Sequence, residues 1–289
     1  MKLRAIAAVA AVSLLVAACA DGSSTTSTTS GGGTIDHPTG ARQLVLRVAT
    51  GGGFTAPEYQ LRTIPEFSLY GDDSIITPGP QIEIYPPPAL PSIQTQPVSE
   101  DGVQAILQAA IDAGVDTGVD MTDMGSTMIA DAPTTTFTIS VNGATNTFAV
   151  YALGMGSGDC PKGMAAAECD ARTALSSFVG QLSKLDGWLP AGSLGEMATY
   201  DPTGSRVYVG DVRHDEQLPQ KKAAWPLEPP LASFGDDTGT GYRCGVVTGS
   251  DWTTLQPVAA GTNELTPWTS DGTSYGLVFR PLLPDETGC

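Results

Sequence analysis

TTTFTISVNGATNTFAVYAL, residues 134–153, is the stretch that decides the fold of this chain. In its first half an apolar side chain occupies every second position from Phe137, which is the period of a half-buried β-strand. Asn142 and Gly143 follow, and this dipeptide favours a two-residue hairpin turn because both residues tolerate positive φ. The second half alternates again, so the segment predicts an antiparallel hairpin.

Outside the hairpin, three segments have the 3.6-residue apolar period of amphipathic helices: residues 99–113, 168–186 and 250–260. Ser99 is a candidate N-cap for the first of them, and Gly114 is its stop signal.

Shorter strands are expected among turn residues on both sides of these helices. Their composition predicts strands at residues 44–49, 58–64, 66–72, 74–77, 81–85, 206–212 and 274–282. Hairpins mixed with isolated helices are typical of an α+β fold. We therefore predict mostly antiparallel sheet or sheets with two or three amphipathic helices.

The N-terminal segment MKLRAIAAVAAVSLLVAAC, residues 1–19, has the three-part layout of a secretory signal. Lys2 and Arg4 form its basic head, and the apolar run after them is shorter than the roughly 20 residues that cross a bilayer. The ending VAAC resembles the lipobox of bacterial lipoproteins. This resemblance implies removal of residues 1–18, lipidation of Cys19 and attachment to the extracytoplasmic face of the cell membrane.

The chain after the signal divides by composition. Residues 19–41 are rich in serine, threonine and glycine, and predict a disordered tether behind the lipidated cysteine. Residues 42–289 predict an extracytoplasmic α+β globular region, and the prolines near residues 86–98 leave a sub-boundary open there.

Charge limits the partners of the exported chain. The full sequence has a formal charge of −17, and loss of Lys2 and Arg4 with the signal leaves 12 basic against 31 acidic residues, a charge of −19. Such a field repels nucleic acid and anionic lipid headgroups. We therefore expect no nucleic-acid partner, and we expect the lipid rather than surface charge to hold the protein at the membrane.

Cysteine usage agrees with export. Four cysteines remain besides Cys19, namely Cys160, Cys169, Cys244 and Cys289, and an even number in an exported chain predicts two disulfides with three possible pairings. Proximity in the sequence favours Cys160–Cys169 and Cys244–Cys289.

No catalytic motif in the sequence lies in the structural context that its chemistry requires. Residues 272–276, GTSYG, match GxSxG, but Ser274 opens a predicted strand and no histidine follows it. His214 lies among acidic residues with no evident nucleophile, and no glycine-rich phosphate motif precedes a helix, so no cofactor is expected. We predict no catalytic residue, although two facing carboxylates suffice for glycoside cleavage and leave no local motif.

One acidic series is a weak candidate for calcium. Asp112, Asp116, Asp120 and Asp123 recur at regular spacing, and calcium prefers oxygen ligands. The EF-hand pattern fails because Thr117 stands where that loop requires glycine. The alternative is a solvated loop after the first helix.

PEFSLYGD at residues 65–72 and RPLLPDE at residues 280–286, with the terminal Cys289, resemble segments of uncharacterised exported lipoproteins of high-GC Gram-positive (actinobacterial) bacteria. That resemblance implies no activity. GGF at residues 52–54, between two predicted strands, is similar to the opening of small metalloprotease-inhibitor domains.

Three function classes follow. The first is a membrane-anchored binding or structural surface domain with a protein or cell-wall partner. The alternative is an extracellular protease inhibitor, which an exposed, rigid loop at residues 51–57 would favour. The second alternative is a carboxylate-dependent hydrolase, which a deep pocket with two carboxylates and aromatic walls would favour.

Overall fold

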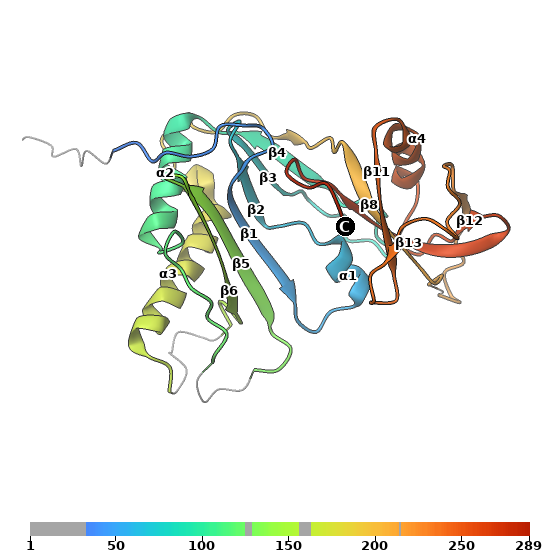
Figure 1. Cartoon of the computed structure of the whole chain (residues 1–289), viewed down its shortest axis with the longest axis horizontal. Helices are drawn as coiled ribbons and strands as arrows, with labels where there is room; N and C mark the ends of the chain where they lie inside the picture. Colours follow the sequence, from blue (N-terminus) through green and yellow to red (C-terminus); the bar gives the residue numbers. More distant parts are fainter. Residues whose placement is uncertain (1–32, 125–128, 156–162, 214) are drawn as a thin grey trace, which may run out of the picture. The chain divides into compact units, whose positions relative to one another are not determined.

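The computed structural model describes residues 33–124, 129–155, 163–213 and 215–289. In that part of the chain, two sheets that are almost wholly antiparallel combine with four α-helices (Figure 1). This confirms the α+β class, with one helix more than the sequence predicted. The helices are α1 Pro57–Arg62, α2 Glu100–Asp112, α3 Ala166–Leu182 and α4 Gly249–Ala260, and a 3-10 turn, η1 Leu185–Gly187, follows α3.

The first sheet has the strand order β6-β5-β1-β2-β3-β4-β7. Its strands are β1 Leu44–Gly52, β2 Phe67–Tyr70, β3 Ser74–Pro78, β4 Ile93–Pro97, β5 Pro133–Val141, β6 Ala144–Tyr151 and β7 Ala198–Thr199. The second sheet has the order β10-β11-β8-β13-β12-β9. Its strands are β8 Gly204–Gly210, β9 Ala223–Ala224, β10 Asp236–Asp237, β11 Arg243–Thr248, β12 Trp268–Ser270 and β13 Thr273–Pro281.

Strands β5 and β6 form the predicted hairpin. Asn142 and Gly143 have φ of 51° and 75°, as the expected turn requires, and Val141 pairs with Ala144 across it. Buried and partly exposed residues alternate along β5. The Phe137 ring stacks on Phe148 of the partner strand, with ring centroids 5.2 Å apart, so the hairpin contributes one face to the main core.

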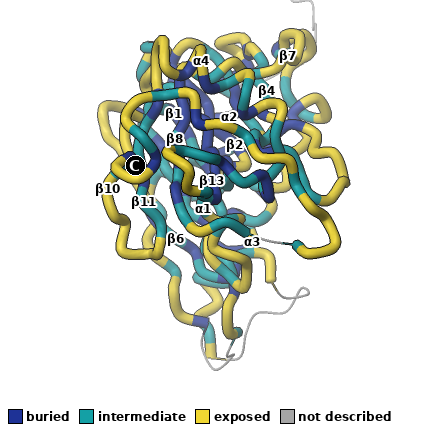
Figure 2. Tube along the Cα trace, turned by 90° about the vertical axis from the view of Figure 1, so that its right-hand side faces the viewer, coloured by how far each residue is buried: buried dark blue, intermediate teal, exposed yellow. Residues whose placement is uncertain are grey.

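Helices α2 and α3 cover that face. Ser99 caps α2 as predicted, because its hydroxyl accepts a hydrogen bond from the Gly102 amide. Ile106 of α2 and Phe178 of α3 are each at most 1% exposed and pack in one cluster with Phe67 of β2. Figure 2 shows the buried residues gathered along the inner strands and the exposed ones in the connections.

The opposite face of the first sheet is covered by the end of the chain. Tyr70 and Ile76 of this face form a cluster with Leu283, which follows β13. Because both faces are covered, all four residues of β2 are buried. The second sheet has its own core around Trp268 and Phe279, and α4 packs into it through Leu255.

Two strand predictions are wrong. Residues 57–62 form helix α1 instead of a strand, because Pro57 starts the helix and Glu58 lies in its first turn. Residues 81–85 pair with no strand, and Ile82 remains 65% exposed. The alternating isoleucines fit a strand, but the prolines on both sides of this segment cannot donate to a ladder.

Two predicted boundaries also move. The folded body is one compact unit, Thr34–Cys289, so it begins before residue 42. Ile35 is buried, and its amide and carbonyl both bond to the Gln104 side chain, at 2.7 and 2.9 Å. The sub-boundary near residues 86–98 is absent, because β4 lies inside the first sheet and the Ala89 amide donates to the Thr262 carbonyl at 3.1 Å. Among the described residues, no helix has the length and apolar character needed to span a membrane.

Candidate functional site: a groove beside helix α3

A groove of about 650 Å³ lies between the end of α3 and strands β1–β4. Its floor is apolar and consists of Val48, Phe67 and Ile75 from three neighbouring strands. Each of these residues is at most 2% exposed, so the floor itself offers little accessible surface. Its accessible surface therefore belongs mainly to the walls and the rim.

One wall of the groove is formed by the end of α3. The helix stops at Leu182 and the chain tightens into η1, which places Leu182, Leu185 and Asp186 along the groove. Residues 194–197 form the far wall. The Gly195 amide donates to the Pro97 carbonyl at 2.8 Å, and the Gln96 side chain donates to the Gly195 carbonyl at 3.0 Å. These bonds fix the far wall to β4.

Strand register places amides and hydroxyls beside the floor. Thr77 pairs with Gln94 and Ile75 with Gln96, so the side chains of these four residues share one face of the sheet. Gln96 is bound to Gly195, whereas the side chains of Thr77 and Gln94 have no hydrogen-bond partner among the described residues. Two polar groups are therefore available next to the apolar floor.

Glu66 and Asp186 bring two carboxylates to the groove. Glu66 precedes β2, and its Oε2 accepts a hydrogen bond from the Thr50 amide at 2.8 Å. Asp186 lies in η1, directly after the end of α3. The aromatic walls expected of a glycosidase are missing among the described lining residues, since the single aromatic one, Phe67, is 1% exposed. The groove therefore contains two carboxylates, as the hydrolase alternative requires, but it lacks the exposed aromatic side chains on which a sugar would stack.

The acidic series proposed for calcium does not assemble. Asp112 ends α2 and accepts from Gln108, while Asp120 accepts from the Ala149 amide at 2.8 Å and so completes the edge strand β6. The Asp123 backbone carbonyl accepts a hydrogen bond from the Arg172 side chain. Across the described ranges, no three side chains of the metal-binding types, Asp116 among them, are grouped closely enough to hold an ion. The described fold therefore does not bring these four carboxylates together.

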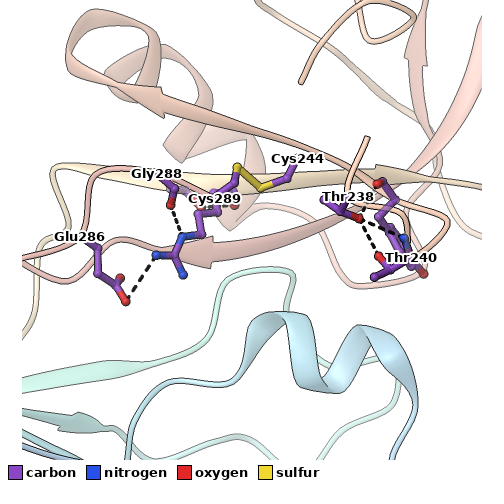
Figure 3. Close-up of a disulfide and its surroundings, with 9 residues drawn as sticks. Thr238, Thr240, Cys244, Glu286, Gly288 and Cys289 are labelled. Carbon is purple, nitrogen blue, oxygen red and sulfur yellow. Dashed lines mark hydrogen bonds and ion pairs between the residues drawn. A yellow bond between two sulfur atoms is a disulfide. The ribbon is translucent and has the colours of Figure 1, made fainter. Parts of the chain in front are cut away.

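None of the remaining residues that the sequence suggested as functional is among the described residues that line the groove. Ser274 lies inside β13 opposite Thr269, which is not the strand-to-helix turn of a nucleophile. His214, Cys19 and Cys160 lie outside the described residues, so lipidation and the Cys160–Cys169 pairing stay predictions. The Cys244–Cys289 disulfide is present, with Cα atoms 6.0 Å apart (Figure 3).

Sequence reasoning missed a polar cluster under the C-terminal tail. Asp285 receives two hydrogen bonds from Arg47, at 2.8 and 3.0 Å, and one from the Tyr70 hydroxyl at 2.7 Å. Glu286 next to it pairs with Arg280 and lies 3.6 Å from Arg206. The cluster joins the tail to both sheets, and the acidic pair in RPLLPDE was its only local signal.

Burial raises the pKa of Asp285, but the hydrogen bonds and charge of Arg47 and the bond from Tyr70 outweigh it and hold that pKa below its usual range. Burial raises the pKa of the Tyr70 hydroxyl well above its usual value. Tyr70 is fully buried. We therefore assign the cluster to stability rather than to chemistry.

The loop between β1 and α1 presents an exposed aromatic residue. Phe54 is 91% exposed, yet its amide donates to the Asp131 carbonyl at 3.1 Å. Gly53 has φ of 79°, and a Cβ there would come within 3.3 Å of the Asp131 carbonyl. The backbone of the loop is thus fixed by a hydrogen bond, while the Phe54 side chain faces solvent.

Comparison of the chain with protein-family models, with curated proteins and with solved structures found no match.

Proposed function

We propose that this protein is an extracytoplasmic binding domain, held at the membrane through Cys19, and that the groove beside α3 takes a small amphiphilic ligand. One observation carries the proposal: the accessible apolar side chains of Val179, Leu194 and Met197 lie in one groove with the unpaired side chains of Thr77 and Gln94. Concave sites that combine apolar lining with a few polar groups are typical of small-molecule binding. The groove volume of about 650 Å³ lies in the range of such sites.

Filling the groove should abolish binding of an apolar probe. Met197 lines the far wall and is 48% exposed, so Met197→Trp places a large ring at the mouth with little strain in the core. We expect the affinity of the mature protein for the neutral fluorophore N-phenyl-1-naphthylamine to fall about tenfold or more. Fluorescence titration measures it.

Met155→Trp is the matched control, because Met155 is 46% exposed and lies outside the groove. The control should bind as the unchanged protein does. Equal affinity of Met197→Trp and Met155→Trp would exclude the groove as the site.

The anchor has a separate test. Cys19→Ala removes the thiol that the lipobox resemblance makes the lipid acceptor, so the variant should be released to the medium or remain unprocessed. Cell fractionation with immunoblotting measures this. A variant that stays in the membrane at full length and at the original mobility would show that Cys19 is not the anchor.

A second candidate function, protease inhibition, is favoured by the fixed and exposed Phe54 loop. The resemblance behind it is weakened, because helix α1 follows GGF where the inhibitors have a strand. If the loop inhibits a metalloprotease, Phe54→Ala should lose the inhibition with unchanged stability, while Ile82→Ala, another exposed apolar residue, should keep it. A panel of secreted metalloproteases provides the assay, and no inhibition by the unchanged protein would exclude this candidate.

A further inference from the structure

The groove beside α3 is uniform in charge. Both ionisable side chains that line it, Glu66 and Asp186, are acids, and none of its described lining residues is basic. Lys184 is the nearest cation in sequence to Asp186, but it is exposed and does not line the groove. The whole chain adds to this field with its formal charge of −17.

Each carboxylate adjoins the apolar surface directly. Glu66 precedes Phe67 of the floor, and Asp186 follows Leu185, an 8% exposed residue of the wall. Because both carboxylates line the same groove, a positive group held by either one would place an attached apolar chain inside the groove.

Both acids also keep acceptor capacity. Asp186 has no hydrogen bond or ion pair with any described residue. Glu66 uses Oε2 for the Thr50 amide, and no described residue bonds to its Oε1. Carboxylates with open lone pairs favour a donor that carries positive charge, since charge-assisted bonds are the stronger ones.

We infer that the ligand of this groove is a cationic amphiphile, a single apolar chain that ends in a protonated amine. The inference rests on the proposed binding function and adds the class of ligand. The ammonium group pairs with Glu66 or Asp186, and the chain lies along the apolar walls formed by Val179, Leu194 and Met197. Thr77 and Gln94 bond to polar atoms near the head. An anionic head of the same length is repelled.

Three probes of equal chain length test the inference on the mature protein: decylammonium, decanol and decanoate. Isothermal titration calorimetry below the concentration of micelle formation gives the affinities. Decylammonium should bind about fivefold more tightly than decanol at low salt, because Glu66 and Asp186 are exposed and an exposed ion pair is modest in strength. Decanoate should bind most weakly, and the preference for the cation should shrink as salt is added.

Asp186→Asn should lower the affinity for decylammonium toward that for decanol, with the decanol affinity unchanged. Asp170→Asn is the matched control, because Asp170 is an exposed acid on α3 outside the groove. Glu66→Gln keeps the acceptor for the Thr50 amide and should act as Asp186→Asn does.

The outcomes separate the two proposals. Equal binding of all three probes, or tightest binding of decanoate, overturns the inference and leaves the binding function standing. Binding of none of them overturns the binding function as well. A preference for decylammonium that Asp170→Asn removes as completely as Asp186→Asn would assign it to net charge and overturn the inference.

Discussion

Removing the Cys244–Cys289 disulfide should lower the free energy of unfolding by about 4 kcal/mol. The bond closes a loop of 45 residues, and the loss of chain entropy in the unfolded state gives about that value. It also holds the last residue of the chain against β11, next to the polar bonds of Gly288 and Glu286 (Figure 3). Cys244 is 4% exposed, so alanine suits its site, and serine suits the exposed Cys289.

Urea unfolding of Cys244→Ala/Cys289→Ser, followed by tryptophan fluorescence, measures the loss. Thr287→Ala is the matched control, because Thr287 is an exposed residue of the same tail that bonds to no described residue. The control should unfold at the same urea concentration as the unchanged protein. If the double variant did so too, the disulfide would not constrain the unfolded chain.

The local signals of this sequence predicted the parts of the fold that local chemistry decides. The hairpin turn at Asn142 and the cap at Ser99 are fixed by residues next to one another, and both predictions are confirmed. The Cys244–Cys289 pair was also predicted, because the proximity of Cys160 and Cys169 in the sequence left these two cysteines as the second pair.

The errors arose where a distant contact overrides local composition. Residues 58–64 have strand composition, but Pro57 starts a helix there. Bonds from Glu58 to Tyr242 and from Arg62 to Glu264, both in connections outside the strands, hold that helix in place. The composition of residues 34–41 predicts a tether, but Ile35 joins the core, where its backbone bonds to the Gln104 side chain of α2.

The groove could not be predicted for a related reason. Its floor comes from three strands and its walls from the end of α3 and from residues 194–197, so no short window of sequence contains it. Glu66 and Asp186 look like ordinary surface acids until the strand order is known.

Asp285→Ala should lower the free energy of unfolding by about 3 kcal/mol, the low end of the cost of breaking a buried ion pair. The low end applies because the side chains of Arg47 and Asp285 retain 16% and 22% exposure. The change leaves the Arg47 guanidinium and the buried Tyr70 hydroxyl without their acceptor. Urea unfolding at pH 7 measures the loss, and Glu83→Gln, an exposed acid with no bond to a described residue, should unfold as the unchanged protein does.

The Asp285 carboxylate should also make the stability of the fold depend on pH in the acid range. The folded pKa of Asp285 lies below its usual range because of Arg47 and Tyr70, against the opposing effect of burial. Its contribution is therefore complete above the pKa of an unfolded aspartate, about 4, and is lost as the pH falls through the lower folded pKa. The stability difference between the unchanged protein and Asp285→Asn should accordingly be constant near neutral pH and shrink below about pH 4. A difference that stayed the same down to about pH 2 would show that the Asp285 carboxylate is not ionised in its bonds to Arg47.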